Sequence, residues 1–320
     1  MCIFCILGLA LFLWLLHIYM TGGVCKIKKD LNGKIVFITG ANTGIGKETA
    51  LQLGMMGATV VIACRDTNKG QLVLDQLNKI TKAYMIKLDL SCLNSVKQCV
   101  EDFKKLNISQ IDILINNAGV MAPQTYKITK QSYELQFGTN HLGHFLLTEL
   151  LISYLKSAQQ SRVVNVASLA HKHSQLDFKD INCAQYANSK LWPIKYNIQA
   201  YGNSKLCNIL HAMEISKRHG IKGCSLHPGV VRTELVREIV GNPILNLLFK
   251  LVTPIYFIFT KSCLQGAQTT LQCALEDYDK LIDGGYYSDC KLKQPKFANK
   301  QLAEKLWDFS VEKLRMYMQK

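Results

Sequence analysis

Short runs of apolar, β-branched residues alternate along the chain with longer stretches in which apolar residues recur every three or four positions. The short runs predict strands and the longer stretches predict helices. Strands that alternate with helices form successive βαβ units, so the pattern predicts an α/β fold with one doubly wound parallel sheet and helices on both faces. The predicted strands are residues 34–39, 59–63, 84–88, 111–115, 162–167, 223–226 and 286–288, and a last helix is predicted at about 301–318.

Two stretches, residues 169–199 and 236–260, do not fit this alternation. Long irregular segments in a compact domain usually carry function, so both are candidates for forming a site. The second stretch is strongly apolar but is interrupted by Lys250 and Pro254. We interpret it as an apolar lid that also touches a bilayer. Ordinary core or a homodimer interface is the alternative interpretation.

The N-terminal segment contains no charged side chain from Met1 to Met20. Such a helix is long enough to cross about 30 Å of hydrocarbon, so a transmembrane helix is expected at residues 1–22, ahead of one folded domain at 30–320. A cleaved signal peptide is the alternative, but the segment lacks a basic start and a small-residue cleavage site. Lysines cluster directly after it, at residues 26–29, and the positive-inside rule then places the domain in the cytosol.

Composition narrows the class of protein only slightly. The 320 residues are 48% hydrophobic and 19% charged, which excludes a disordered chain. Thirty-eight basic and 23 acidic residues give a net charge of +15, which suits an anionic membrane, cofactor or nucleic acid. The lysines form no dense run and accompany no aromatic recognition motif, so a nucleic-acid partner is not expected. Twelve cysteines without a repeated spacing framework favour a reducing compartment.

A glycine-rich loop follows the first predicted strand and precedes a helical pattern. Glycine lets the backbone approach a pyrophosphate closely, and the helix N-terminus offers free N–H groups to that anion, so this order predicts a Rossmann-like dinucleotide site. A tight turn is the alternative. Arg65 ends the second strand where an NAD enzyme would place a carboxylate, and it favours NADP(H) over NAD(H) unless it is simply a surface arginine. Asp89 ends the third strand, either to contact the adenine or to cap the next helix. The loop residues expected at the cofactor are Gly40, Asn42, Thr43, Gly44, Ile45 and Gly46.

Further motifs resemble those of a known family, the short-chain dehydrogenases/reductases. They run in order from about residue 34 to about 288, which is most of the chain after the apolar segment. Three stretches, residues 64–66, 140–148 and 168–171, are similar to the membrane-bound retinol dehydrogenase branch. The matching motifs are Thr39 to Gly46, Asn116-Asn117-Ala118-Gly119, Asn140, Ser168, a Tyr-x-x-x-Lys and Pro228-Gly229.

The Tyr-x-x-x-Lys motif occurs twice, at residues 186–190 and 201–205. The chemistry needs the phenol and the ammonium one turn apart on a continuous helix. Pro193 would break a helix that ran on from the first copy. The second copy opens an uninterrupted helical pattern, so we identify Tyr201 and Lys205 as the catalytic pair.

The resemblance implies a role for each catalytic residue. Tyr201 would be the acid or base, with its pKa lowered by the nearby Lys205 ammonium. Lys205 would also hold the nicotinamide ribose, Ser168 would hydrogen-bond the substrate oxygen, and Asn140 would support a water linked to the lysine. Cofactor contacts are further implied for Asn117, Ala118, Gly119, Pro228, Gly229, Val231 and Thr233.

These expectations combine into an NADP(H)-dependent oxidoreductase that interconverts a lipophilic alcohol and its aldehyde or ketone. Retinoids are the substrates that the resemblance implies, with steroids and fatty aldehydes as alternatives, and the endoplasmic reticulum is the expected membrane. A membrane-tethered scaffold that binds NADP without turnover is the non-enzyme alternative. No metal is expected, because His141, His144 and His171 are better explained by structural roles.

Overall fold

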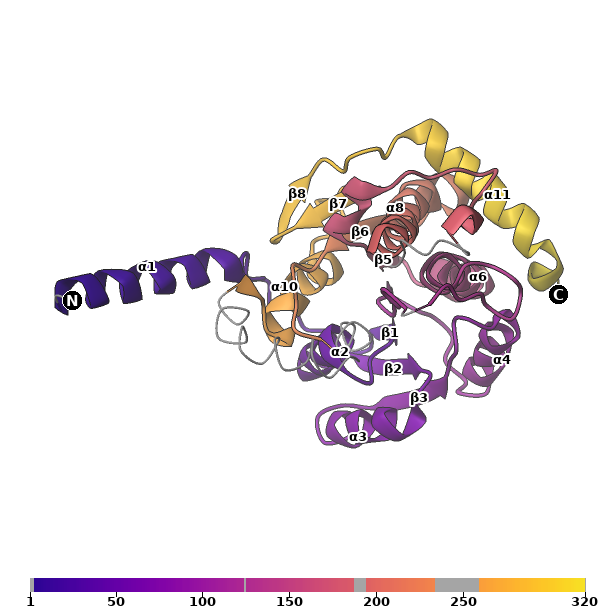
Figure 1. Cartoon of the computed structure of the whole chain (residues 1–320). Helices are drawn as coiled ribbons and strands as arrows, with labels where there is room; N and C mark the ends of the chain where they lie inside the picture. Colours follow the sequence, from indigo (N-terminus) through magenta and orange to yellow (C-terminus); the bar gives the residue numbers. More distant parts are fainter. Residues whose placement is uncertain (1–2, 124, 187–193, 234–258, 320) are drawn as a thin grey trace.

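The strands of the chain form a single sheet in the computed structural model, which describes residues 3–123, 125–186, 194–233 and 259–319 (Figure 1). The order is β3-β2-β1-β4-β5-β6-β7-β8, with every neighbouring pair parallel except β7 and β8. This is the predicted Rossmann-like sheet. The strands are β1 (Ile35–Thr39), β2 (Thr59–Cys64), β3 (Ala83–Lys87), β4 (Ile113–Asn116), β5 (Arg162–Val166), β6 (Lys222–His227), β7 (Gly285–Ser288) and β8 (Lys291–Lys293).

Helices cover both faces of this sheet, because successive strand side chains point to opposite sides. Phe37 packs into the core shared with α4, α6, α8 and α11, whereas Val36 and Ile38 pack into the core shared with α2, α3 and α10. The helices are α1 (Ile3–Thr21), α2 (Gly44–Met55), α3 (Thr67–Leu77), α4 (Leu93–Lys104), α5 (Leu135–Phe137), α6 (Gly143–Leu150), α7 (Ile152–Ser157), α8 (Ile194–His219), α10 (Cys263–Leu275) and α11 (Lys300–Met318).

The strand order reverses at β1, which pairs with β2 on one side and β4 on the other. In a doubly wound sheet, ligands bind outside the carboxyl ends of the strands at such a reversal. The glycine loop follows β1, the Asn116 to Gly119 motif begins at the end of β4, and Ser168 follows β5. The topology therefore gathers these segments, which are far apart in the sequence, at one edge of the sheet.

Most predicted elements are confirmed, and each of the seven predicted strands lies within two residues of its observed bounds. The sequence pattern missed β8, which is only three residues long, all of them exposed. Helix α8 begins at Ile194, well before Tyr201, where the sequence pattern places the start of the helix. It ends at His219, and Gly220 follows with φ +73°.

The N-terminal segment forms helix α1, which extends away from the sheet and its covering helices (Figure 1). Within the described parts of the chain, no helix meets the length and apolarity required to cross a membrane. The predicted lid at residues 236–260 lies outside the described residues except for Phe259 and Thr260.

Candidate active site

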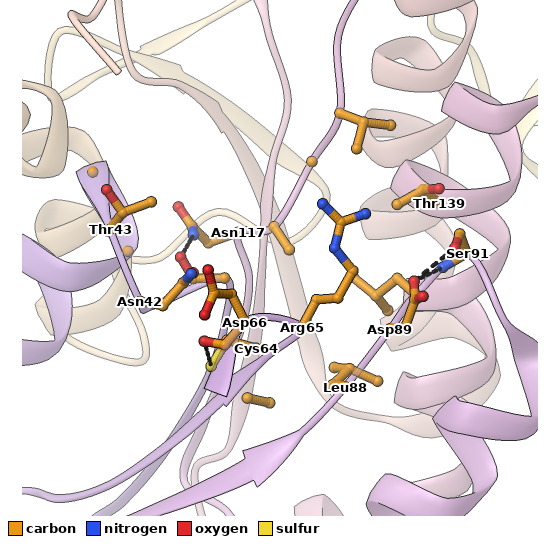
Figure 2. Close-up of a pocket in the computed structure, with 18 of the residues that line it drawn as sticks. Asn42, Thr43, Cys64, Arg65, Asp66, Leu88, Asp89, Ser91, Asn117 and Thr139 are labelled. Carbon is orange, nitrogen blue, oxygen red and sulfur yellow. Dashed lines mark hydrogen bonds between the residues drawn. The ribbon is translucent and has the colours of Figure 1, made fainter. Parts of the chain in front are cut away.

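A cleft of about 630 Å³ opens at the carboxyl ends of β1, β2, β3 and β4 (Figure 2). Its walls come mainly from the loops that follow these strands and from the first turn of α2, with Thr233 among the other contributors. Most residues expected at the cofactor line it: Gly40, Asn42, Thr43, Gly44, Ile45, Gly46, Arg65, Asp89, Asn117, Ala118, Gly119 and Thr233.

The glycine loop packs too closely against the loop after β4 to admit side chains. Gly40 has φ +66°, and a Cβ there would lie 2.8 Å from the Cα of Ala118. A Cβ on Gly46 would lie 2.4 Å from Nδ2 of Asn117. That amide donates hydrogen bonds to the carbonyl oxygens of Thr39 and Gly40. The two loops therefore form a cradle of bare backbone at the N-terminus of α2, which fits the pyrophosphate of a dinucleotide.

Arg65 and Asp89, which follow the neighbouring strands β2 and β3, line one end of the cleft (Figure 2). Arg65 is exposed at the end of β2, beside Asp66, which caps α3 by accepting from the N–H of Lys69. The carboxylate of Asp89 accepts from both the backbone N–H and the hydroxyl of Ser91, at 3.0 and 2.6 Å. Helix α4 begins only at Leu93, so the expectation that Asp89 caps it is wrong.

Three of the predicted catalytic residues meet where β5 ends against α8. Ser168 follows β5 and hydrogen-bonds the hydroxyl of Tyr201. Lys205 lies one turn further along α8, with Nζ 5.6 Å from the centre of the Tyr201 ring. A Cβ on Gly119, in the wall of the cleft, would lie 3.4 Å from that Nζ. The structure thus places the phenol and the ammonium together at the border of the cleft.

Asn140, the fourth predicted residue, sits in a π-helical turn, Gly138–Leu142, between α5 and α6. Such turns are rare in proteins, and those that occur are often found at functional sites. Its side chain donates to the carbonyl oxygen of Val120 and to Oγ of Ser204, each at 3.0 Å, and accepts from the N–H of Val120 at 2.8 Å. A Cβ on Gly119 would also lie 3.3 Å from its Oδ1. Asn140 therefore joins α8 to the loop that lines the cleft.

Burial moves the pKa of both members of the Tyr-Lys pair against their charged forms. The pKa of Tyr201 rises from its ordinary value to about 12, because burial outweighs the opposing hydrogen bond from Ser168. The pKa of Lys205 falls to about 8, also through burial. The expected lowering of the Tyr201 pKa is therefore not seen in the chain alone, since the effect of burial exceeds that of the Ser168 hydrogen bond.

His141 and His144 are buried and make hydrogen bonds within the domain. His144 donates from Nδ1 to the carbonyl oxygen of Asn140, and its Nε2 accepts from the hydroxyl of Thr39. The Thr39 oxygen in turn accepts the N–H groups of Asn117 and Ala118. His141 pairs with Ser310 through Nε2. In the described part of the chain, no cluster of three or more His, Cys, Asp or Glu residues suits a metal ion.

Some predicted site residues lie elsewhere. Pro228, Gly229 and Val231 do not line the cleft among the described residues. Val231 instead pairs with the backbone of Lys261, and a Cβ on Gly229 would lie 2.7 Å from the side-chain carbons of the same lysine. In the other copy of the motif, Tyr186 ends a short 3-10 turn, while its partner Lys190 lies outside the described residues.

The cleft also includes side chains that the sequence analysis missed. Among them are the polar side chains of Lys69, Ser91, Lys127 and Thr139. Ser91 was detectable, because it lies two residues after Asp89, at the end of a predicted strand. Lys127 belongs to a segment between elements, where no periodicity marked it.

A sequence profile described as short chain dehydrogenase matches residues 34–191. Retinol dehydrogenase 12 of Homo sapiens is 43% identical over 304 residues, which cover 92% of this chain and 91% of that protein. Retinol dehydrogenase 11 of Homo sapiens is 39% identical, with coverage of 92% and 90%. The chain belongs to the short-chain dehydrogenase/reductase family, in its retinol dehydrogenase branch. As a member of this family it is an oxidoreductase.

Solved structures agree with this family fold. An uncharacterised protein of Mycobacterium paratuberculosis aligns with a TM-score of 0.69 at 30% identity, covering 92% of this chain and 98% of that one. RhlG of Pseudomonas aeruginosa, solved as an NADP active-site complex, aligns with a TM-score of 0.61 at 23% identity, covering 81% and 95%. The second likeness concerns the fold alone.

Proposed function

We propose that this protein is an NADP(H)-dependent oxidoreductase that interconverts a lipophilic alcohol and its aldehyde or ketone, with Tyr201 as the acid or base. One observation carries the proposal: the Tyr201 hydroxyl is hydrogen-bonded to Ser168, with the Lys205 ammonium beside it at the border of a cleft shaped for a dinucleotide. The names of the retinol dehydrogenase relatives support a retinoid-like substrate.

The cleft fits the proposed cofactor in shape and charge. The bare backbone around Gly40 and Gly46 would hold the pyrophosphate at the N-terminus of α2, and Arg65 would pair with the 2′-phosphate that distinguishes NADP(H). Lys205 would hold the nicotinamide ribose, and residues 228–233 would close over the nicotinamide. When bound, the reduced cofactor supplies the hydride for reduction, and the oxidised cofactor accepts it in the reverse direction.

The chain itself handles the proton. In reduction, the Tyr201 phenol would donate its proton to the oxygen that gains charge as the carbonyl is reduced, while Ser168 hydrogen-bonds the same oxygen. The phenolate left on Tyr201 is unfavourable in a buried site. The Lys205 ammonium offsets this cost, because a positive charge close to the ring favours the ionised phenol. In oxidation, the same phenolate would accept the proton of the alcohol.

The proposed setting is a membrane, with residues 1–22 as an anchor and residues 30–320 as the catalytic domain in the cytosol. The support is the uncharged sequence of α1 and the lysines that follow it at residues 26–29. An apolar substrate dissolved in the bilayer suits an anchored enzyme. The endoplasmic reticulum is the proposed membrane, and a homodimer is the proposed assembly.

A cofactor-dependent assay on the full-length protein in detergent tests this function. The loss of reduced nicotinamide absorbance is followed with NADPH or NADH and with all-trans-retinal, a medium-chain aldehyde or a steroid ketone. We expect NADPH-dependent turnover with at least one lipophilic carbonyl, and no turnover in Ser168→Ala. Cofactor binding without turnover on every substrate would instead favour the tethered scaffold, and faster use of NADH would overturn the assignment of NADP(H).

A further inference from the structure

The peptide unit that joins Ser168 to Leu169 is held by two imidazoles from different elements. The carbonyl oxygen of Ser168 accepts a hydrogen bond from Nδ1 of His171 at 2.7 Å. The N–H of Leu169 donates to Nδ1 of His227 at 3.2 Å. These are the two polar groups of one peptide plane, so the pair of bonds fixes the orientation of that plane directly after Ser168.

The surrounding contacts determine which ring nitrogen carries the proton. The backbone N–H of Lys296 donates to Nε2 of His171 at 3.1 Å, so this nitrogen is unprotonated and Nδ1 carries the hydrogen that Ser168 accepts. His227 accepts at Nδ1, which leaves its proton on Nε2. Each imidazole must therefore be neutral for this arrangement to exist.

Burial keeps both imidazoles in this neutral form. The side chain of His171 is fully buried against Tyr286, with ring centres 5.1 Å apart. Burial lowers the pKa of His171, and the hydrogen bond to Ser168 opposes it only partly. The pKa of His227 falls to about 4, through burial first and then through the nearby Lys261 ammonium, with Asp289 acting in the opposite direction. Both rings are uncharged at neutral pH.

The Ser168 hydroxyl is oriented from the same short turn. Its Oγ accepts the N–H of Ala170 at 3.2 Å, so the hydroxyl hydrogen is free to point elsewhere. The hydrogen bond with Tyr201 gives that direction. A rotation of the Ser168–Leu169 peptide would move both the Ser168 side chain and the Ala170 N–H that orients it.

We propose that His171 and His227 are positioning residues for Ser168, which hold its peptide plane so that its hydroxyl faces Tyr201 and the substrate oxygen. The inference rests on the proposed function, in which Ser168 and Tyr201 act on the substrate. It also gives a role to the C-terminal part of the chain, because the backbone at Lys296 and the ring of Tyr286 hold His171 in place.

Asparagine and glutamine replacements separate positioning from simple structural support. Asparagine places an amide group where Nδ1 of histidine lies, whereas glutamine places it where Nε2 lies. His171→Asn keeps the donor to Ser168 and loses the acceptor for Lys296, and His171→Gln does the reverse. His227→Asn likewise keeps the acceptor for Leu169, and His227→Gln loses it. His173→Gln, at an exposed histidine of the same turn, is the matched control.

The experiment measures kcat, KM, the Kd for NADPH and the thermal unfolding midpoint of the full-length variants, with Ser168→Ala alongside. We expect both glutamine variants to lose about 10- to 100-fold in kcat with the Kd for NADPH unchanged, since small misplacements of a reacting group have effects of this size. The asparagine variants and His173→Gln should keep a kcat within about threefold of that of the parent. His171→Asn and His171→Gln each lose one hydrogen bond, so their thermal unfolding midpoints should be similar and a difference in kcat between them cannot come from stability.

Equal kcat values for the asparagine and glutamine variants would overturn the inference. If Ser168→Ala abolishes turnover at the same time, the proposed function stands and only the positioning role is lost. If Ser168→Ala turns over normally, the proposed function fails first and the inference with it. Should one histidine position tolerate neither replacement, the pair at the other position decides.

Discussion

The ammonium of Lys205 donates a hydrogen bond to the carbonyl oxygen of Val166, with 2.9 Å between the two atoms. This contact joins the middle of α8 to the last residue of β5, two positions before Ser168. The end of one strand thereby places both the serine and the lysine of the proposed catalytic group. The lysine is 3% exposed, so its charge is expensive to maintain there.

The lowered pKa of Lys205 predicts a falling rate at alkaline pH. Burial sets this pKa at about 8, so the ammonium loses its proton as the pH rises through that value. The loss removes the positive charge that stabilises the Tyr201 phenolate and is proposed to hold the cofactor ribose. In the reductive direction, kcat/KM for NADPH should be level at neutral pH and fall above pH 8 by up to about tenfold per unit, because kcat/KM reports groups of the free enzyme. A profile that stays level or rises one to two units above pH 8 would contradict this account.

Replacing Arg65 should change the choice of cofactor. A charge-assisted hydrogen bond to the 2′-phosphate contributes about 1.5 to 3 kcal/mol, so Arg65→Ala should raise the KM for NADPH by about 10- to 100-fold and leave the KM for NADH nearly unchanged. Arg315→Ala, at an exposed arginine of α11, provides the matched loss of charge away from the cleft. An unchanged ratio of the two KM values in Arg65→Ala would show that Arg65 does not read the phosphate.

A buried carboxylate, Glu134, connects the loop before α5 to the start of α8. It is 0% exposed, and it accepts from the hydroxyl of Tyr196 at 2.6 Å and the N–H of Phe137 at 2.7 Å. Glu134→Ala would take the acceptor away from these buried donors. We expect a loss of about 3 kcal/mol in the free energy of unfolding, measured by urea denaturation. Glu304→Ala, which removes an exposed ion pair with Lys217, should leave the free energy of unfolding nearly unchanged. Equal losses in the two variants would contradict the role of Glu134.

The proposed cytosolic orientation can be tested with an acceptor sequence for N-glycosylation that the chain already contains. Asn107-Ile108-Ser109 fits the acceptor pattern, and Asn107 is exposed. If the domain faces the cytosol, Asn107 remains unmodified when the protein is made in the presence of endoplasmic reticulum membranes. An added Asn-Gly-Ser acceptor on an extension ahead of Met1 should then be glycosylated. A glycan on Asn107, detected as a mobility shift that an endoglycosidase removes, would reverse the proposed topology.

The sequence predicted the sheet well because parallel strands buried on both faces leave a clear signal, a short apolar run between helical patterns. It missed β8 for the opposite reason. Lys291, Leu292 and Lys293 are all exposed, and this strand is defined only by pairing with β7 at the edge of the sheet. Such pairing is a tertiary contact that no local pattern encodes.

The candidate site was predictable in its residues but less so in its energetics. The motifs identified Tyr201, Lys205 and Ser168, and strand topology brings them together. The direction of the Tyr201 pKa was not predictable, because it depends on how completely α8 is buried. That His171 and His227 bond the two polar groups of one peptide could not be predicted from the sequence, because the two residues lie on different elements and meet only through the fold.

A comparison of two phenylalanine variants, Tyr201→Phe and Tyr186→Phe, tests the central claim most directly, because each removes one hydroxyl from one of the two Tyr-x-x-x-Lys sequences. NADPH-dependent reduction of a lipophilic aldehyde and NADPH binding are measured for both. The account predicts that Tyr201→Phe loses at least about 100-fold in kcat while it still binds NADPH, since acid–base catalysis contributes a factor of about 10² to 10⁴. Tyr186→Phe should behave like the parent. Turnover that survives in Tyr201→Phe, or disappears in Tyr186→Phe, would contradict it.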